Sequence, residues 1–342
     1  MVPDDATILC AVSGGADSMA LLHGLCGVVD AFSSRWSLAV AHFDHRLRAE
    51  SGGDARFVAD AASALGLAFF EDAADVRELA RRRRQTVEEA ARRCRYEFLA
   101  RAARQARAGF VAMGHHADDQ AETVLHRIVR GTALRGLAGI PPTRPIERGS
   151  DILVVRPLLP FRRRQLRAYL QATGRAYRDD VTNRSTDGST RNRIRREILP
   201  LLARDMNPDV AAALVRLSHQ ARRAGEALRA VAEKTLDSQA VDQAEGCVVL
   251  SAGALADLPI GLRHEIIHAA LQRLGVGMKA VTAERIEAAA RLCIEPGRPR
   301  TVELPDGAAV HRRGDELRIE SARGRSARRD REPAADEAVT PR

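Results

Sequence analysis

The chain has 342 residues, enough for about two domains with ordinary hydrophobic cores, which excludes a small module held together by disulfides or metal ions. Hydrophobic residues make up 45% and charged residues 29% of the sequence, whereas aromatic residues make up only 4%, too few for an extended base-stacking surface. The net charge of +9 favours a polyanionic partner. However, 52 of the 54 basic residues are arginine, an imbalance that drift in codon composition also explains.

Cysteine usage and the N-terminus indicate a cytoplasmic protein. The five cysteines form no C-x-x-C pair and have no zinc-site spacing, so we predict reduced thiols. The N-terminus is acidic and leads at once into a short apolar run, which is the wrong order for a signal peptide. No stretch approaches the roughly 20 apolar residues of a membrane span, so we expect no membrane partner.

Short apolar runs alternate with helical segments in the first half of the chain. The predicted helices include residues 51–65 and 87–107. The predicted strands are residues 7–12, 37–42, 67–71, 110–114 and 152–156. This alternation predicts an α/β fold with a doubly wound parallel sheet, whose ligand site lies beyond the carboxyl ends of the strands.

The second half is more helical and ends in a small α+β domain. Its predicted elements are helices 161–173, 191–203, 208–236 and 261–274, a strand at 247–250 and a Gly/Pro-punctuated segment at 296–319. The residues after 320 lack periodicity. We therefore predict four parts, a catalytic domain (1–205), a linker helix (206–235), a small substrate-contacting domain (236–321) and a disordered tail (322–342).

A glycine-rich turn follows the first predicted strand directly. It consists of Ser13, Gly14, Gly15, Ala16, Asp17 and Ser18. Such a turn aims backbone N–H groups at one point beside a helix N-terminus, which suits a phosphate chain. It has neither the lysine of a kinase-type P-loop nor a G-x-G-x-x-G pattern. The alternative is an ordinary strand-to-helix turn capped by Asp17 or Ser18.

The second predicted strand ends at His42, Asp44 and His45. At a carboxyl end, these side chains face the predicted ligand site, and Asp44 can hold a magnesium ion through water. The alternative is that the histidines are surface or capping residues.

Two histidines and three acidic residues follow the fourth strand, namely His115, His116, Asp118, Asp119 and Glu122. If a helix begins at Asp118 or Asp119, Glu122 shares a face with both aspartates. Three clustered carboxylates are costly unless they bind a cation, either magnesium or an ammonium group. The alternative is a capping box formed by Asp119 and Glu122, which needs no ligand.

Taken in order, these motifs resemble the tRNA(Ile)-lysidine synthetase family of the N-type ATP pyrophosphatases, which carry a PP-loop. The resemblance is strong over residues 7–203 and weaker over 236–320. Further matching motifs are Leu47-Arg48, Gly136-Leu137-x-Gly139, Arg156-Pro157-Leu158-Leu159, Asp180-x-Thr182-Asn183 and Arg191-Asn192-x-Ile194-Arg195. The sequence has Arg46 where the family usually has glycine.

The resemblance implies an enzyme that uses ATP and Mg²⁺ to join free L-lysine to C2 of the wobble cytidine of tRNA(Ile) with a CAU anticodon. It implies adenylation of the C2 oxygen, followed by displacement of AMP by the lysine amine. The catalytic residues would be Asp17, Asp118, Asp119, Glu122, Arg191 and Arg195. Nucleotide binding would involve Ser13 to Ser18, His42, Asp44 and His115, and magnesium would be held by Asp17 and Asp44.

Asp118, Asp119 and Glu122 would form a pocket for the lysine ammonium, and Arg191 and Arg195 would clamp the α-phosphate or the tRNA backbone. We also expect Arg222, Arg223, Arg263 and Arg273 to contact tRNA phosphates, and a homodimer is one option for the assembly. One competing class is a tRNA thiolase of the same superfamily, which needs paired cysteines or an iron–sulfur cluster. The other is a non-catalytic RNA-binding protein, in which the acidic residues would be eroded.

Overall fold

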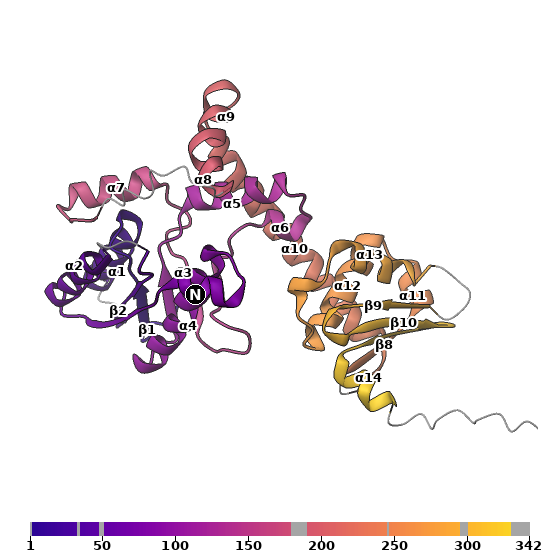
Figure 1. Cartoon of the computed structure of the whole chain (residues 1–342). Coiled ribbons are helices and arrows are strands. Elements are labelled where there is room, and N and C mark those ends of the chain that lie inside the picture. The colour runs from indigo at the N-terminus through magenta and orange to yellow at the C-terminus, as the bar shows by residue number, and fades with distance from the viewer. Residues whose placement is uncertain are drawn as a thin grey trace, which may run out of the picture. The chain divides into compact units, whose positions relative to one another are not determined.

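The computed structural model describes residues 2–32, 35–47, 51–178, 190–244, 246–294 and 300–329. The chain forms two compact units, Met1–His219 and Gln220–Arg342 (Figure 1). Two parts of the predicted motifs, Arg48 and the run Asp180-x-Thr182-Asn183, lie outside the described residues. Across the described ranges, no helix is both long and apolar enough to cross a membrane.

The first unit is built on a six-stranded sheet in the order β3-β2-β1-β4-β6-β5. Its strands are β1 (Thr7–Ala11), β2 (Ser37–Asp44), β3 (Ala68–Ala73), β4 (Phe110–Met113), β5 (Thr143–Pro145) and β6 (Leu153–Val155). All neighbouring strands are parallel except the edge strand β5, which pairs antiparallel with β6. The predicted doubly wound parallel sheet is therefore confirmed.

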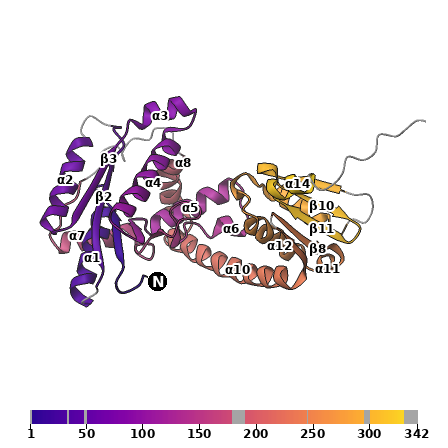
Figure 2. The same ribbon diagram turned by 90° about the horizontal axis from the view of Figure 1, so that it is seen from below.

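Successive side chains of β1 point to opposite faces of this sheet. Ile8 and Cys10 pack into a core with α1 (Ala16–Phe32), α2 (Ser51–Ala64) and α7 (Arg163–Ala172), whereas Leu9 packs into a second core with α4 (Val87–Gln105). Figure 2 shows α2 on one side of β2 and β3 and α4 on the other. Because both faces are covered, the strands are short continuous apolar runs.

The helices of the first unit agree largely with the predicted segments. They are α1 (Ala16–Phe32), α2 (Ser51–Ala64), α3 (Val76–Arg83), α4 (Val87–Gln105), α5 (Ala117–Val129), α6 (Leu134–Leu137), α7 (Arg163–Ala172), α8 (Thr190–Arg193) and α9 (Leu199–Asp205). The single helix predicted for 191–203 is wrong in one respect, because a π-helical turn at Ile194–Ile198 separates α8 from α9. Such turns are frequent at functional sites.

Helix α10 (Val210–Gln239) leads along the chain into the second unit, which is an antiparallel α+β domain. Its sheet has the order β7-β8-β11-β10-β9, and apolar side chains such as Val248, Ile267 and Leu317 form its core. The elements are β7 (Ala240–Ala244), β8 (Cys247–Ser251), α11 (Ala252–Ala256), α12 (Ile260–Arg273), α13 (Ala283–Arg291), β9 (Arg300–Glu303), β10 (Ala309–Arg313) and β11 (Glu316–Glu320).

Two predictions for this second unit are wrong. Helix α14 (Ala322–Arg329) begins directly after Ser321, whose N–H donates to the Gly246 carbonyl, where the sequence predicted the start of a disordered tail. The rest of that predicted tail, residues 330–342, lies outside the described residues. Arg263 is only 7% exposed because α12 turns it into the core, so it is not available to tRNA phosphates. Arg273 is exposed and pairs with Asp237 at 2.7 Å, so its tRNA contact, like those of Arg222 and Arg223, stays a prediction.

Candidate active site

The glycine-rich turn connects the end of β1 to the start of α1. Gly14 has a φ of +87°, a conformation that favours glycine. The Ser18 hydroxyl folds back to accept from the Ser13 N–H at 3.1 Å and to donate to the Gly15 carbonyl at 2.9 Å. The Arg178 N–H also donates to the Gly14 carbonyl at 2.9 Å, so the loop is fixed from two sides. A rigid turn before a helix N-terminus is suited to phosphate binding.

His116 connects this loop to the acidic motif after β4. Its ring is fully buried, and Nε2 lies 3.3 Å from Asp17 Oδ2. Burial disfavours ionisation of both groups, but their mutual attraction outweighs it and raises the pKa of His116 and lowers the pKa of Asp17. The approach is close because residue 114 is glycine: a Cβ there would lie 3.1 Å from the Asp17 carbonyl oxygen.

A capping box begins α5, but it involves His116 rather than Glu122. His116 is the N-cap residue, and its Nδ1 accepts from the Asp119 N–H at 3.3 Å while Asp119 Oδ2 accepts from the His116 N–H at 3.1 Å. The alternative considered above, a box between Asp119 and Glu122, is therefore excluded, since the helix begins at Ala117. Glu122 takes no part in capping and lies one turn further into the helix.

Asp118 is paired with two arginines that lie outside the predicted motifs. Its Oδ1 accepts from Arg162 Nε at 2.9 Å, and its Oδ2 accepts from the Arg163 N–H at 2.7 Å. Burial raises the pKa of Asp118, but these partners more than compensate and lower it. The Arg163 guanidinium also reaches Asp17 Oδ2 at 3.1 Å. The sequence carries a signal for this pairing. Arg162 and Arg163 lie at the start of a helix, where the helix dipole favours acidic side chains, so an acidic partner is expected beside them.

Asp119 and Glu122 meet Arg191 and Arg195 in a compact ion-pair cluster. Arg195 Nη2 lies 2.9 Å from Glu122 Oε2 and 3.1 Å from Asp119 Oδ1, whereas Arg191 is held more loosely, at 3.2 and 3.5 Å from the same two carboxylates. Glu122 is only 2% exposed. Arg191, in α8, and Arg195, in the π-helical turn, thus both contact the same two carboxylates. The three acidic residues therefore do not form one unpaired pocket.

His115 lies among basic side chains beside this cluster. Burial lowers its pKa to about 3, and the charges of Arg156, Arg95 and Arg191 add to this effect against the opposing charge of Asp119. His115 is therefore neutral at physiological pH and offers a hydrogen bond rather than a charge. Its Nδ1 is buried, and no group in the described parts of the chain hydrogen-bonds to it.

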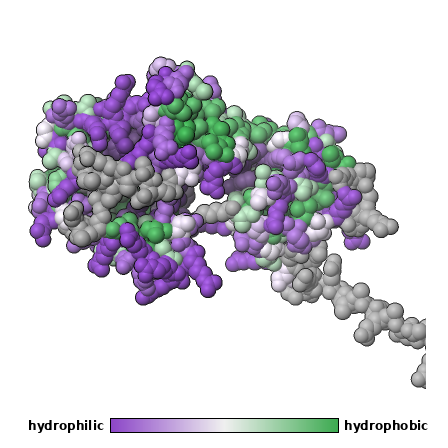
Figure 3. All heavy atoms as spheres, turned by 45° about the horizontal axis from the view of Figure 1, so that its top comes forward, coloured by the Kyte–Doolittle hydropathy of each residue, from purple (hydrophilic) through white to green (hydrophobic). Residues whose placement is uncertain are grey.

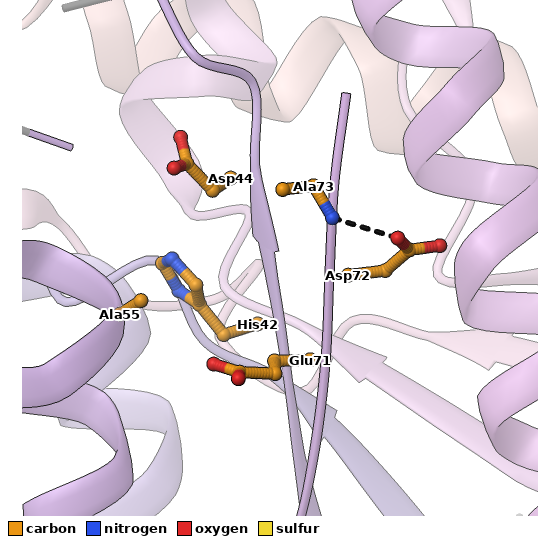
Figure 4. Close-up of a pocket in the computed structure, with 6 residues that line it drawn as sticks. All are labelled: His42, Asp44, Ala55, Glu71, Asp72 and Ala73. Atoms are coloured by element: carbon orange, nitrogen blue, oxygen red, sulfur yellow. Dashed lines mark hydrogen bonds between the residues drawn. The ribbon is translucent and has the colours of Figure 1, made fainter. Parts of the chain in front are cut away.

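A cavity of about 280 Å³ opens at the carboxyl ends of β2 and β3. Figure 4 shows its lining residues, which are His42, Asp44, Ala55, Glu71, Asp72 and Ala73. His42 Nδ1 donates to the Val12 carbonyl at 2.9 Å, which ties this wall to the residue between β1 and the glycine-rich turn. The predicted nucleotide residues His42 and Asp44 thus share one cavity.

The turn after Asp44 shows why glycine is usual in the family at the position that Arg46 occupies in this chain. Arg46 has a φ of +48°, which glycine adopts most easily, and its N–H donates to Asp44 Oδ1 at 2.8 Å. His45 packs edge-on against Phe43, with ring centroids 4.9 Å apart, and burial lowers its pKa to about 4. His45 is therefore a packed, neutral residue and does not line the cavity.

The carboxylates of the site fit a magnesium ion only when phosphates complete its ligands. Among the described residues, no three His, Cys, Asp or Glu side chains converge on a metal position. Magnesium is commonly held by one or two carboxylates together with substrate phosphates and water. Asp17 suits this arrangement, because its Oδ1 is buried beside the loop and accepts no hydrogen bond from the described chain.

The fold and the loop together define a PP-loop domain. The family profile described as a PP-loop domain matches residues 3–202, and the one described as the TilS substrate binding domain matches residues 250–318. A U34-tRNA thiolase from Methanococcus maripaludis has the same fold, with a TM-score of 0.51 at 15% identity over 64% of this chain and 73% of that chain.

Curated relatives narrow the class further, and all three named here are tRNA(Ile)-lysidine synthases. The protein from Chlorobaculum tepidum is 35% identical over 91% of this chain and 89% of its own length. Those from Geobacter sulfurreducens and Symbiobacterium thermophilum are 36% and 40% identical over 92% and 82% of this chain, which spans 65% and 59% of their lengths. The chain belongs to the tRNA(Ile)-lysidine synthase family.

Proposed function

We propose that this chain ligates free L-lysine to C2 of the wobble cytidine of tRNA(Ile) with a CAU anticodon, using ATP. The contact between Asp17 and His116 carries the proposal, because it joins the phosphate-binding loop to the acidic start of α5. A reaction that first adenylates a base and then admits an amine needs both sites at one sheet edge. The relatives' names and both family profiles support the same activity.

In the first step, the C2 oxygen of cytidine attacks the α-phosphorus of ATP, and the bond to the departing pyrophosphate breaks. The N–H groups of the turn from Ser13 to Ser18 bind the pyrophosphate, and Arg163 beside Asp17 adds positive charge. Asp17, with Asp44 toward the cavity, would hold magnesium, which neutralises phosphate charge. His42 and His115 face the rest of the nucleotide as hydrogen-bonding groups.

In the second step, the ε-amino nitrogen of lysine attacks C2, and AMP leaves with the oxygen. Lysine arrives as an ammonium ion and must lose a proton before it is nucleophilic. Asp119 and Glu122 supply the negative charge that attracts it, and one of these two carboxylates accepts the proton that the amine loses. Arg191 is the more exposed and more loosely held of their two partners, so the ammonium displaces Arg191 and frees its guanidinium for the α-phosphate.

The thiolase alternative lacks support in the site. Cys10 is buried, and burial raises its pKa to about 12, which suppresses the thiolate. Its neighbour Cys26 also has a raised pKa, because of burial and then the charge of Asp30. The thiolase likeness shows the fold alone.

The decisive experiment measures AMP release from ATP with the unmodified tRNA transcript, with and without lysine. We expect AMP release that requires both the transcript and lysine, and a lysine-modified cytidine in the digested RNA. AMP release that does not depend on lysine, or an RNA product that contains sulfur, would contradict the proposal.

A further inference from the structure

The arginines of α3 form an exposed basic surface that the reaction site does not use. We define the α3 patch as Arg77 and Arg81 to Arg84, all of which are exposed. Residues 76–85 contain these five arginines and a single acid, Glu78, for a net charge of +4. Glu78 pairs with Arg82 at 2.8 Å and more weakly with Arg81 at 3.5 Å. Within the described ranges, Arg83 and Arg84 have no ion-pair partner.

Helix α3 begins at the same sheet edge as the candidate active site. The Ala74 N–H donates to the Asp44 carbonyl at 3.0 Å, and the Val76 N–H donates to the His45 carbonyl. Figure 2 shows α3 beyond the ends of β2 and β3. Only Val76 and Ala80 of the helix are buried, so the arginines face outward from this edge. Figure 3 shows hydrophilic side chains over much of the visible face of the first unit.

Arg84 occupies a backbone position at which glycine would be more stable. It ends α3 with a φ of +51°, and its N–H donates to the Arg81 carbonyl while Gln85 N–H donates to the Ala80 carbonyl. This left-handed helix end favours glycine or asparagine. Adjacent arginines also repel one another. A polyanion bound along the patch would offset the repulsion and would give the arginine at position 84 a role that glycine could not fill.

We infer that the α3 patch binds the phosphates of the anticodon arm of the tRNA. The inference rests on the proposed function, because adenylation brings the wobble cytidine to the loop at this edge. Its flanking phosphates must therefore lie around the same edge. Arginines that contact phosphates position the RNA and contribute affinity without reading its sequence. The α3 patch thus contributes to tRNA affinity, whereas the reaction depends on the ion-pair cluster of Asp119 and Glu122.

The chain contains a matched control for Arg84. Arg107 follows α4 with the same φ of +51° and is also exposed. It has the same hydrogen-bond pattern, because its N–H donates to the Arg104 carbonyl and the Ala108 N–H donates to the Ala103 carbonyl. However, Arg107 precedes β4 and therefore lies at the amino edge of the sheet. Helix α4, with 19 residues and a length of about 28 Å, separates the two positions.

The test compares Arg84→Gly, Arg83→Gln/Arg84→Gly and Arg107→Gly in the full chain. Filter binding of the unmodified tRNA(Ile) transcript is measured at several salt concentrations, and AMP release provides KM for tRNA and kcat. We expect Kd to rise about fivefold for each lost contact and the log–log salt slope to flatten by about 0.7 to 0.9 each. The kcat should stay unchanged, and Arg107→Gly should behave like wild type.

Glycine suits both positions, so each variant should melt no lower than wild type, and weak binding cannot be attributed to misfolding. Equal effects of Arg84→Gly and Arg107→Gly, or an unchanged slope in the double variant, would overturn the inference. If wild type forms no lysidine but still binds the transcript through the α3 patch, the proposed function fails and the inference stands. If lysidine forms normally and the double variant binds like wild type, only the inference fails.

Discussion

Both units bury charged side chains, including Arg263 and Glu320 in the second, but they differ in where these side chains gather. The first unit buries His116 and Glu122 at the carboxyl edge of its sheet, where their partners come from segments far apart in the chain. The second unit is held mainly by apolar residues between one sheet and the helices α12 and α13. Buried charges are costly unless they are paired, so they indicate a site, whereas apolar burial mainly provides stability. Substitutions in the first unit should therefore affect catalysis most, and those in the second should affect unfolding.

The largest effect should come from Asp17→Ala. The variant removes the partner of His116 and Arg163 and the buried oxygen beside the loop. We expect both pyrophosphate release and lysidine formation to fall by about 10³-fold, in line with the loss of a key electrostatic group. Initial rates with the tRNA transcript measure both. Near-normal AMP formation would show that Asp17 only caps α1.

In the second unit, Ile267→Ala should cause a loss of similar size, but in the free energy of unfolding and not in ATP chemistry. Ile267 is fully buried, so its truncation should lower the free energy of unfolding by about 2 to 5 kcal/mol. Trp36 is the only tryptophan and lies in the first unit, so its fluorescence reports that unit alone. In urea, the circular dichroism transition should move earlier while the Trp36 transition stays in place. A joint shift would mean that the units unfold together.

Glu122→Gln should separate the two chemical steps. It keeps the shape of the side chain but removes one of the negative charges that face Arg191, Arg195 and the proposed ammonium. We expect lysine use to fall by about 10- to 100-fold, the range for losing a charge-assisted hydrogen bond, with a smaller effect on pyrophosphate release. Lysine titrations with both products measured provide the test. Equal losses in both steps would assign Glu122 to adenylation.

The smallest effect concerns the pH dependence of the first unit. The pKa of His115 is about 3 in the folded protein, below the ordinary histidine value of about 6.5, so the unfolded chain binds the proton first. The contribution of neutral His115 to the free energy of unfolding is therefore fully present above pH 6.5. It falls by about 1.4 kcal/mol per pH unit as the pH drops toward 3. His115→Asn should reduce the loss of stability between pH 7 and pH 5 by about 2 kcal/mol.

Trp36 fluorescence in urea at both pH values measures this difference. The exposed His219 provides the control, because His219→Asn removes a histidine without removing a buried one. Indistinguishable pH dependences for His115→Asn and wild type would mean that His115 is not held neutral by its surroundings.

Local patterns in the sequence were enough to predict the strands, the glycine-rich turn and most helices. The run 7–12 and the alternation of strands and helices define the sheet, because burial on both faces requires continuous apolar strands. The same patterns placed His42, Asp44 and the acidic motif at one sheet edge, since parallel strands share their carboxyl ends. The disordered tail from residue 322 was wrong at its start because a polar, arginine-rich segment carries little signal for α14.

The partners of the charged residues were decided only by the tertiary structure. Nothing in the local sequence shows that Arg162 pairs with Asp118, 44 residues away, or that Arg195 pairs with Glu122 across 73 residues. Likewise, α12 turns Arg263 inward although its sequence resembles a solvated face. Sequence periodicity assigns residues to faces of an element, whereas an ion pair depends on how two distant elements pack. The sequence therefore determined which edge of the sheet carries the site, and packing decided which charges neutralise one another there.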